Sequence, residues 1–265
     1  MPVLGLGTWR MGESARRRPA ELDALKYGLD IGYQMIDTAE MYGEGSAEEI
    51  VGDALAGRGT RPFIVSKVYP HNASRAGTMA ACERSLKRMR LERIDLYLLH
   101  WRGGARIEET FEAFHKLKDA GKIGDFGVSN FDLDDMQDAA KLDQGLNGTN
   151  QVLYCLSRRG PEFDLLPWMR KRSIPLMAYS PLDQGGLLRN ASLGKIAGEV
   201  GCTTAQLALA WLLAQPGVVT IPKSASRERV EENLAALQVK LTPKILADLD
   251  RAFPPPRAKR PLEML

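Results

Sequence analysis

Cysteine and metal-binding patterns are scarce in this sequence. Its three cysteines, Cys82, Cys155 and Cys202, are far apart and form no C-x-x-C pair. A sparse, odd set of cysteines does not form the framework of a disulfide-rich secreted domain. The three histidines fit no H-x-x-x-H spacing, so no zinc site is expected. We therefore predict a protein of the reducing cytoplasm without a bound metal.

Long apolar runs and an excess of one charge are also missing. The longest apolar run, within residues 207–214, is far shorter than the roughly 18 residues of a membrane span. The residues after Met1 contain neither the positively charged segment nor the long apolar segment of a secretory signal peptide. Lys and Arg total 36 against 33 Asp and Glu, a net charge of +3 that is too small and scattered to indicate nucleic-acid binding. Neither a membrane nor a nucleic acid is expected as a partner.

Eight short apolar runs recur along the 265 residues, with amphipathic stretches of helical spacing between them. The runs cover residues 3–7, 33–37, 63–67, 94–100, 123–129, 151–154, 176–179 and 218–221. Continuous apolar runs are typical of parallel strands that are covered on both faces. Eight units in 265 residues average about 33 residues each, which favours a single (β/α)8 TIM barrel over residues 1–265. An open, doubly wound sheet is the alternative.

The ends of the predicted helices carry the expected signals. Ser226 can cap a helix over residues 227–237. Thr242 and Pro243 open one extra C-terminal helix over residues 244–252. The helix over residues 205–214 is apolar nearly all round, so it should be buried by more than the sheet.

Polar side chains end three consecutive predicted strands. Asp37, Lys67 and His100 stand at the ends of the second, third and fourth strands, and Tyr42 follows Asp37 by five residues. A barrel brings these ends together on its C-terminal face, where an unpaired buried charge is costly. Tyrosine holds its proton at neutral pH and can act as an acid, a lysine eases proton release, and a carboxylate keeps that lysine charged. The set suits proton delivery to a carbonyl oxygen that gains negative charge.

These residues lie in motifs that resemble those of the aldo-keto reductases. The motifs, in chain order, are IDTAEMYG (36–43), SK (66–67), LLHW (98–101), GVSN (127–130) and IPKS (221–224). The resemblance covers almost the whole chain and implies a (β/α)8 barrel that binds NADPH across its C-terminal face. It implies reduction of an aldehyde or ketone by hydride transfer. Asp37, Tyr42, Lys67 and His100 match the catalytic tetrad, with Tyr42 as the proton donor.

The resemblance also implies a set of cofactor-binding residues. Ser129, Asn130 and Gln151 would hold the nicotinamide carboxamide, and Tyr179 would stack under the ring. The other expected contacts are Gly7, Thr8 and Trp9 after the first strand, Ser180 and Leu182 at the pyrophosphate, and Lys223, Ser224, Arg229, Glu232 and Asn233 at the 2′-phosphate and adenine.

The basic residues near the last strand support the same cofactor on physical grounds. Lys223, Arg227 and Arg229 cluster around a helix N-terminus, which already favours anions. A Lys and an Arg there would favour the 2′-phosphate of NADPH over the hydroxyl of NADH.

Short loops bear on the expected substrate. Only residues 101–106 separate His100 from the next predicted helix, whereas the family often has a long loop at this place. The loop 181–190 and the tail 254–265 are also short. We therefore expect an open pocket for small aldehydes. Many members of the family that the chain resembles are monomers, so we expect a monomer, with an oligomer as the alternative. Two alternatives remain at this stage. Lys67 could form a Schiff base in an aldolase or lyase, or the chain could be a nucleotide-sensing subunit with little turnover.

Overall fold

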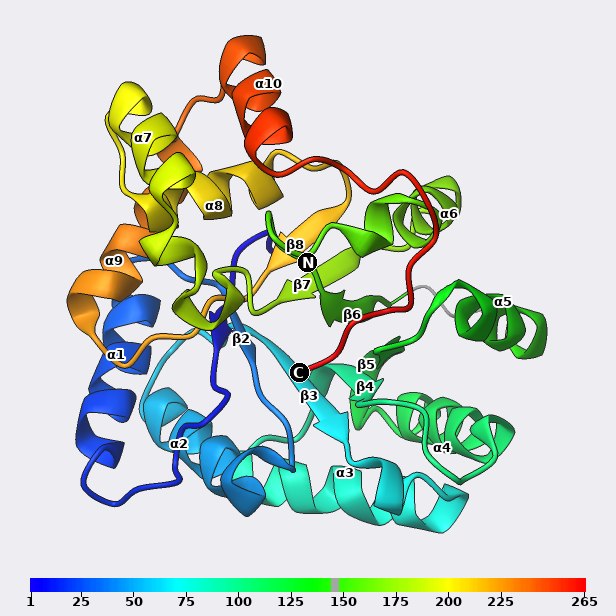
Figure 1. The fold of residues 1–265 in the computed structure, drawn as a ribbon. Coiled ribbons are helices and arrows are strands. Elements are labelled where there is room, and N and C mark those ends of the chain that lie inside the picture. Colours follow the sequence, from blue (N-terminus) through cyan, green and yellow to red (C-terminus); the bar gives the residue numbers. More distant parts are fainter. Residues whose placement is uncertain (144–147) are drawn as a thin grey trace.

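Eight parallel strands form one sheet in which each strand pairs with the next along the chain (Figure 1). The computed structural model describes residues 1–143 and 148–265. The strands are β1 (Leu6–Gly7), β2 (Met35–Asp37), β3 (Phe63–Val68), β4 (Ile94–Leu99), β5 (Ile123–Ser129), β6 (Asn150–Leu153), β7 (Leu176–Tyr179) and β8 (Val218–Thr220).

The first and last strands meet, so the sheet closes on itself. The backbone N–H of Gly5 donates to the carbonyl of Thr220 at 2.9 Å, and that of Gly7 donates to the carbonyl of Pro222 at 3.0 Å. Parallel bridges join Leu4 to Thr220 and Gly7 to Lys223. This closure confirms the barrel and excludes the open, doubly wound sheet.

Helices surround the strands on the outside of the ring (Figure 1). They are α1 (Arg18–Asp30), α2 (Ser46–Leu55), α3 (Arg75–Met89), α4 (Ile107–Asp119), α5 (Leu133–Leu142), α6 (Leu165–Lys171), α7 (Ala191–Val200), α8 (Thr204–Leu213), α9 (Arg227–Ala235) and α10 (Pro243–Ala252). The expected caps are present, because the Ser226 and Thr242 side chains accept from the backbone N–H groups of Arg229 and Ile245. The apolar helix α8 is buried, as predicted.

The hydrophobic core has two parts. One fills the space between the strands and the helices, and the other fills the barrel. The interior residues are Met35, Val65, Leu96, Leu98, Met177, Val219 and Ile221. Side chains alternate along a strand, so Val65 and Lys67 of β3 face the barrel interior, while Ile64, Ser66 and Val68 face the helices. The apolar interior thus supports a polar layer at the C-terminal ends of the strands.

The chain after α10 runs across the C-terminal side of the barrel (Figure 1, red). Ion pairs join Lys259 to Asp134 at 3.3 Å and Arg158 to Glu263 at 3.2 Å. Leu265 lines the cavity at the centre of this side. The pocket is therefore more covered than the short loops predict, because the tail itself supplies part of its wall.

No single helix among residues 1–143 and 148–265 is long and apolar enough to cross a membrane. The bent pair α7 and α8, with 81° between its helices, passes that test only by combined length and composition.

Candidate active site

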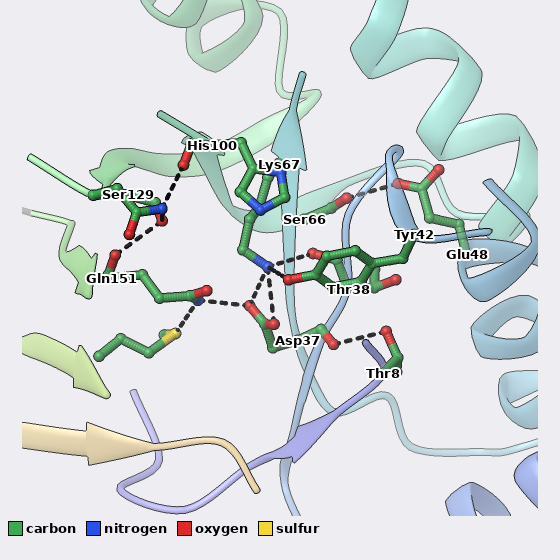
Figure 2. A network of polar contacts seen from close by, with 12 residues as sticks. Thr8, Asp37, Thr38, Tyr42, Glu48, Ser66, Lys67, His100, Ser129 and Gln151 are labelled. Carbon is green, nitrogen blue, oxygen red and sulfur yellow. Dashed lines mark hydrogen bonds and ion pairs between the residues drawn. The ribbon is translucent and has the colours of Figure 1, made fainter. Parts of the chain in front are cut away.

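A buried ion pair lies at the C-terminal end of β2 and β3. The Lys67 Nζ donates to both carboxylate oxygens of Asp37 at 2.9 Å and to the carbonyl of Thr38 at 2.9 Å (Figure 2). Lys67 is 0% exposed and Asp37 is 2% exposed. Adjacent parallel strands place both side chains in the interior layer, as the strand ends predict.

Tyr42 completes the contact above the ion pair. It begins the short 3-10 helix Tyr42–Gly45 after β2, and its hydroxyl lies 3.2 Å from the Lys67 Nζ, which donates to it. The His100 ring lies edge-on to the Tyr42 ring at a centroid distance of 5.6 Å. Tyr42, His100 and Asp37 line one cavity of about 120 Å³, whereas Lys67 lies beneath it. The structure thus brings together all four predicted tetrad residues.

Burial controls the protonation of this group. It raises the pKa of Tyr42 well above 10, and the charge of Asp37 raises that pKa further. Burial also lowers the pKa of His100 well below 6.5, helped by the charge of Lys67, so the imidazole is neutral. Burial lowers the pKa of Lys67, while Asp37 opposes this by favouring the ammonium form. The group therefore holds a phenolic proton at neutral pH next to a cation and a neutral imidazole.

Four polar residues from β5, β6, β7 and the position after β5 form a second layer beside the tetrad. The Tyr179 hydroxyl donates to the side-chain carbonyl of Asn130 at 2.9 Å, and the Ser129 hydroxyl donates to the backbone carbonyl of Gln151 at 2.9 Å. The Gln151 amide donates to Asp37 at 2.8 Å (Figure 2). This layer is therefore connected directly to the carboxylate of the ion pair.

A longer groove continues from this cavity. A second cavity of about 510 Å³ shares Trp9, Ser180, Pro181 and Lys223 with the first, so the two form one groove along the C-terminal face. Among the predicted cofactor contacts, the second cavity is lined by Trp9, Ser180, Leu182, Lys223, Ser224, Arg229, Glu232 and Asn233, and the first also by Gly7, Ser129, Asn130, Gln151 and Tyr179. The groove leads from Tyr42 to the N-terminus of α9.

Thr8 is the predicted cofactor contact that lines neither cavity. It is 0% exposed, and its hydroxyl donates to the backbone carbonyl of Asp37 at 3.0 Å. Its place is below the groove, where it supports the end of β2.

Sequence reasoning missed several lining residues. Met41, Pro181, Ile221 and Leu265 line the first cavity, and Arg10 lines the second. Met41 and Ile221 lie inside motifs already singled out, one residue before Tyr42 and two residues before Lys223, so a signal was available for both. Leu265 had no such signal, because only the path of the tail brings it to the cavity.

The Aldo/keto reductase family model matches residues 3–253. The methylglyoxal reductase YeaE of Escherichia coli (strain K12) is 48% identical over 271 residues, which cover 100% of this chain and 95% of that protein. The glyoxal reductase of Bacillus subtilis (strain 168) is 35% identical over 253 residues, 94% of this chain and 88% of that protein. The crystal structure of an aldo-keto reductase from Klebsiella pneumoniae in complex with NADPH is 49% identical, with a TM-score of 0.96, and the match covers 100% of this chain and 95% of that one.

Proposed function

Because this chain belongs to the aldo/keto reductase family, and is thus an oxidoreductase, we propose that it reduces small aldehydes and ketones to alcohols with NADPH. The observation that carries the proposal is the contact between the Tyr42 hydroxyl and the buried Lys67–Asp37 ion pair, in a groove that continues to the N-terminus of α9.

The groove fits NADPH at both ends. Ser129, Asn130 and Gln151 offer amide and hydroxyl groups that suit a carboxamide. Lys223 and Arg229 would hold the 2′-phosphate, because both are exposed to the groove next to the N-terminus of α9. When bound, the nicotinamide supplies the hydride for the carbonyl carbon.

The four tetrad residues divide the remaining work. Tyr42 keeps its proton until a carbonyl oxygen beside it gains negative charge, and then donates it. The Lys67 ammonium stabilises the phenolate that remains, and Asp37 keeps that ammonium charged and oriented. His100 is neutral and lines the cavity, and its Nδ1 is buried without a hydrogen-bond partner among residues 1–143 and 148–265. A neutral imidazole carries its hydrogen on one ring nitrogen, and a hydrogen on Nε2 leaves only a lone pair at the unpaired Nδ1. The Nε2–H can then donate to the carbonyl oxygen of the substrate and orient it.

The proposed substrates are small. The named relatives include a methylglyoxal reductase and a glyoxal reductase, and the cavity of about 120 Å³ beside Tyr42 must hold the nicotinamide as well as the substrate. Trp9, Met41 and Leu265 add apolar surface to its wall. Short aldehydes with a second carbonyl fit this combination of size and mixed polarity.

The Schiff-base alternative has no support in this arrangement. Lys67 is 0% exposed, lies outside the cavity lining and donates to three acceptor oxygens besides that of Tyr42. An attacking lysine must reach its substrate in the neutral form, whereas Asp37 favours the charged one.

The domain, assembly and location belong to the same proposal. We propose one domain over residues 1–265 that acts as a monomer in the cytoplasm. One closed sheet and the family match over residues 3–253 support the single domain, and the three free cysteines support the reducing location. Gel filtration of the purified chain would test the monomer.

A carbonyl panel with NADPH and NADH in parallel tests the function. We expect NADPH oxidation with short aldehydes and a fall in turnover of at least about 100-fold in Tyr42→Phe, with NADPH binding retained. Tyr27→Phe is the matched control, since Tyr27 lies on the surface and contacts Glu231. A folded Tyr42→Phe variant with the wild-type rate would refute the assignment. Tight NADPH binding without turnover across the panel would favour a sensing subunit.

A further inference from the structure

A second buried carboxylate lies on the outer face of β3, opposite the Lys67 side chain. Glu48, in the first turn of α2, is 0% exposed. Its Oε1 accepts from the Ser66 hydroxyl at 2.6 Å (Figure 2). Its Oε2 accepts from the Arg88 guanidinium of α3 at 2.9 Å. Burial raises the pKa of Glu48, but the hydrogen bonds from Ser66 and Arg88 oppose this by favouring the charged form. The tetrad uses none of these three residues.

The position of Ser66 connects this carboxylate to the tetrad. Ser66 and Lys67 are consecutive in β3, so their side chains leave the strand on opposite faces. Asp37 binds Lys67 from inside the barrel, and Glu48 binds Ser66 from outside. One short stretch of backbone is thus held on both faces at the position that sets where the Lys67 Nζ points.

Charge gives a second connection. Burial lowers the pKa of Lys67, and the negative charges of Asp37 and Glu48 both raise it. His100 and Tyr42 contact or face Lys67 inside the barrel, and neither carries a charge at neutral pH. The titratable and charged groups that face Glu48 are Lys67 of β3, Arg88 and Cys82 of α3 and Tyr97 of β4.

We propose that Glu48 is a positioning residue for carbonyl reduction, which holds β3 through Ser66 and helps keep Lys67 protonated. This inference rests on the proposed roles of Tyr42 and Lys67. Without the Glu48 charge, the folded protein would retain Asp37 alone to offset the desolvation of Lys67. Lys67 would then lose its proton at lower pH, and proton delivery by Tyr42 would fail earlier as the pH rises.

The test compares Glu48→Gln with Glu49→Gln. The two positions are adjacent in α2 and the charge change is the same, but Glu49 is exposed. We expect Glu48→Gln to lower kcat about tenfold, since small displacements of reacting groups have large effects on rate. We also expect the alkaline limb of its kcat–pH profile to move to lower pH, with the Kd for NADPH unchanged. Glu49→Gln should match the wild type. An alkaline limb of Glu48→Gln that coincides with that of Glu49→Gln overturns the inference.

Ser66→Ala separates geometry from charge and serves where Glu48→Gln does not fold. It removes the 2.6 Å hydrogen bond and retains the carboxylate. We expect a lower kcat with an unmoved alkaline limb, and a wild-type kcat would overturn the positioning role. Tyr42→Phe, assayed beside these variants, keeps the two proposals apart. An active Tyr42→Phe refutes the proposed function, whereas an inactive one with unaffected Glu48→Gln and Ser66→Ala variants refutes only the role of Glu48.

Discussion

Replacement of Asp37 by asparagine tests how much the buried ion pair with Lys67 contributes to the stability of the folded protein. The side chain keeps its shape, but the fully buried Lys67 ammonium loses its counter-charge and one of its three strong acceptors. Loss of one partner of a buried pair costs about 3–5 kcal/mol. A chain of 265 residues has an unfolding entropy of about 0.56 kcal/mol/K at roughly 2.1 cal/mol/K per residue. We therefore expect Asp37→Asn to melt about 5–9 °C below the wild type.

The size of this loss should depend on pH in a defined direction. Burial lowers the pKa of Lys67 in the folded state, and without Asp37 only the charge of Glu48 opposes that effect. The penalty is complete below the lowered pKa, where the folded protein must hold a charged lysine. It shrinks as the pH rises from that value toward the unfolded pKa of about 10.4, because the buried amine is then neutral. Thermal unfolding followed by circular dichroism at about pH 6 and about pH 9.5 measures both values.

Asp138→Asn provides the matched control. Asp138 pairs with Lys141 at 3.0 Å, but both side chains are more than half exposed, and such surface pairs contribute about 0.2–1 kcal/mol. Its melting temperature should stay within about 2 °C of the wild type at both pH values. An Asp37→Asn variant that melts with the control at about pH 6 would show that the ion pair adds no such stability. A deficit that does not shrink at the higher pH would show that the charge of Lys67 is not its cause.

Three further predictions concern the groove. Arg229→Ala should weaken NADPH binding about tenfold in a fluorescence titration and leave NADH binding unchanged. The Arg227 side chain binds Asp23 instead, so Arg227→Ala should bind both cofactors like the wild type. An equal loss of affinity for both cofactors in Arg229→Ala would contradict the proposed contact of Arg229 with the 2′-phosphate. In Gly7→Ala the new Cβ would lie 2.6 Å from the backbone carbonyl oxygen of Ile221. The free energy of unfolding, measured with urea, should therefore fall by about 1–3 kcal/mol. An unchanged urea midpoint would contradict this steric clash. Because burial lowers the pKa of His100, a plot of kcat against pH should show no inflection near the ordinary histidine pKa of about 6.5. A clear inflection at that pH would contradict the neutral state of His100.

Apolar runs predicted most of the barrel because buried parallel strands need them. The predicted strands at residues 123–129 and 176–179 match β5 and β7 at both ends. The predicted strand at residues 3–7 shrinks to Leu6–Gly7. Its neighbour on the β8 side contains Pro222, which has no N–H to donate, so that part of the closure consists of isolated bridges.

The polar strand ends predicted the centre of the site for a related reason. A charged side chain at the end of a buried strand needs a partner, and Asp37 and Lys67 supply each other. Glu48 gave no comparable signal, because an acidic residue in the first turn of a helix is ordinary on the surface. Only the packing of α2 against β3 and α3 buries it. The wall formed by Leu265 was hidden for the same reason, since it depends on the path of the tail.

Closure of the ring through β1 and β8 has a consequence for the order of folding during synthesis. The Lys67–Asp37 contact spans 30 residues, whereas the bridge from Gly7 to Lys223 spans more than two hundred. Contacts of such long sequence separation form slowly, and a chain still being made cannot form them at all. The Lys67–Asp37 side of the site, to which we assign proton delivery, can thus assemble early on the ribosome. The cofactor groove, which needs Gly7 beside Lys223, exists only once the last strand has emerged, so NADPH binding would report a completed barrel.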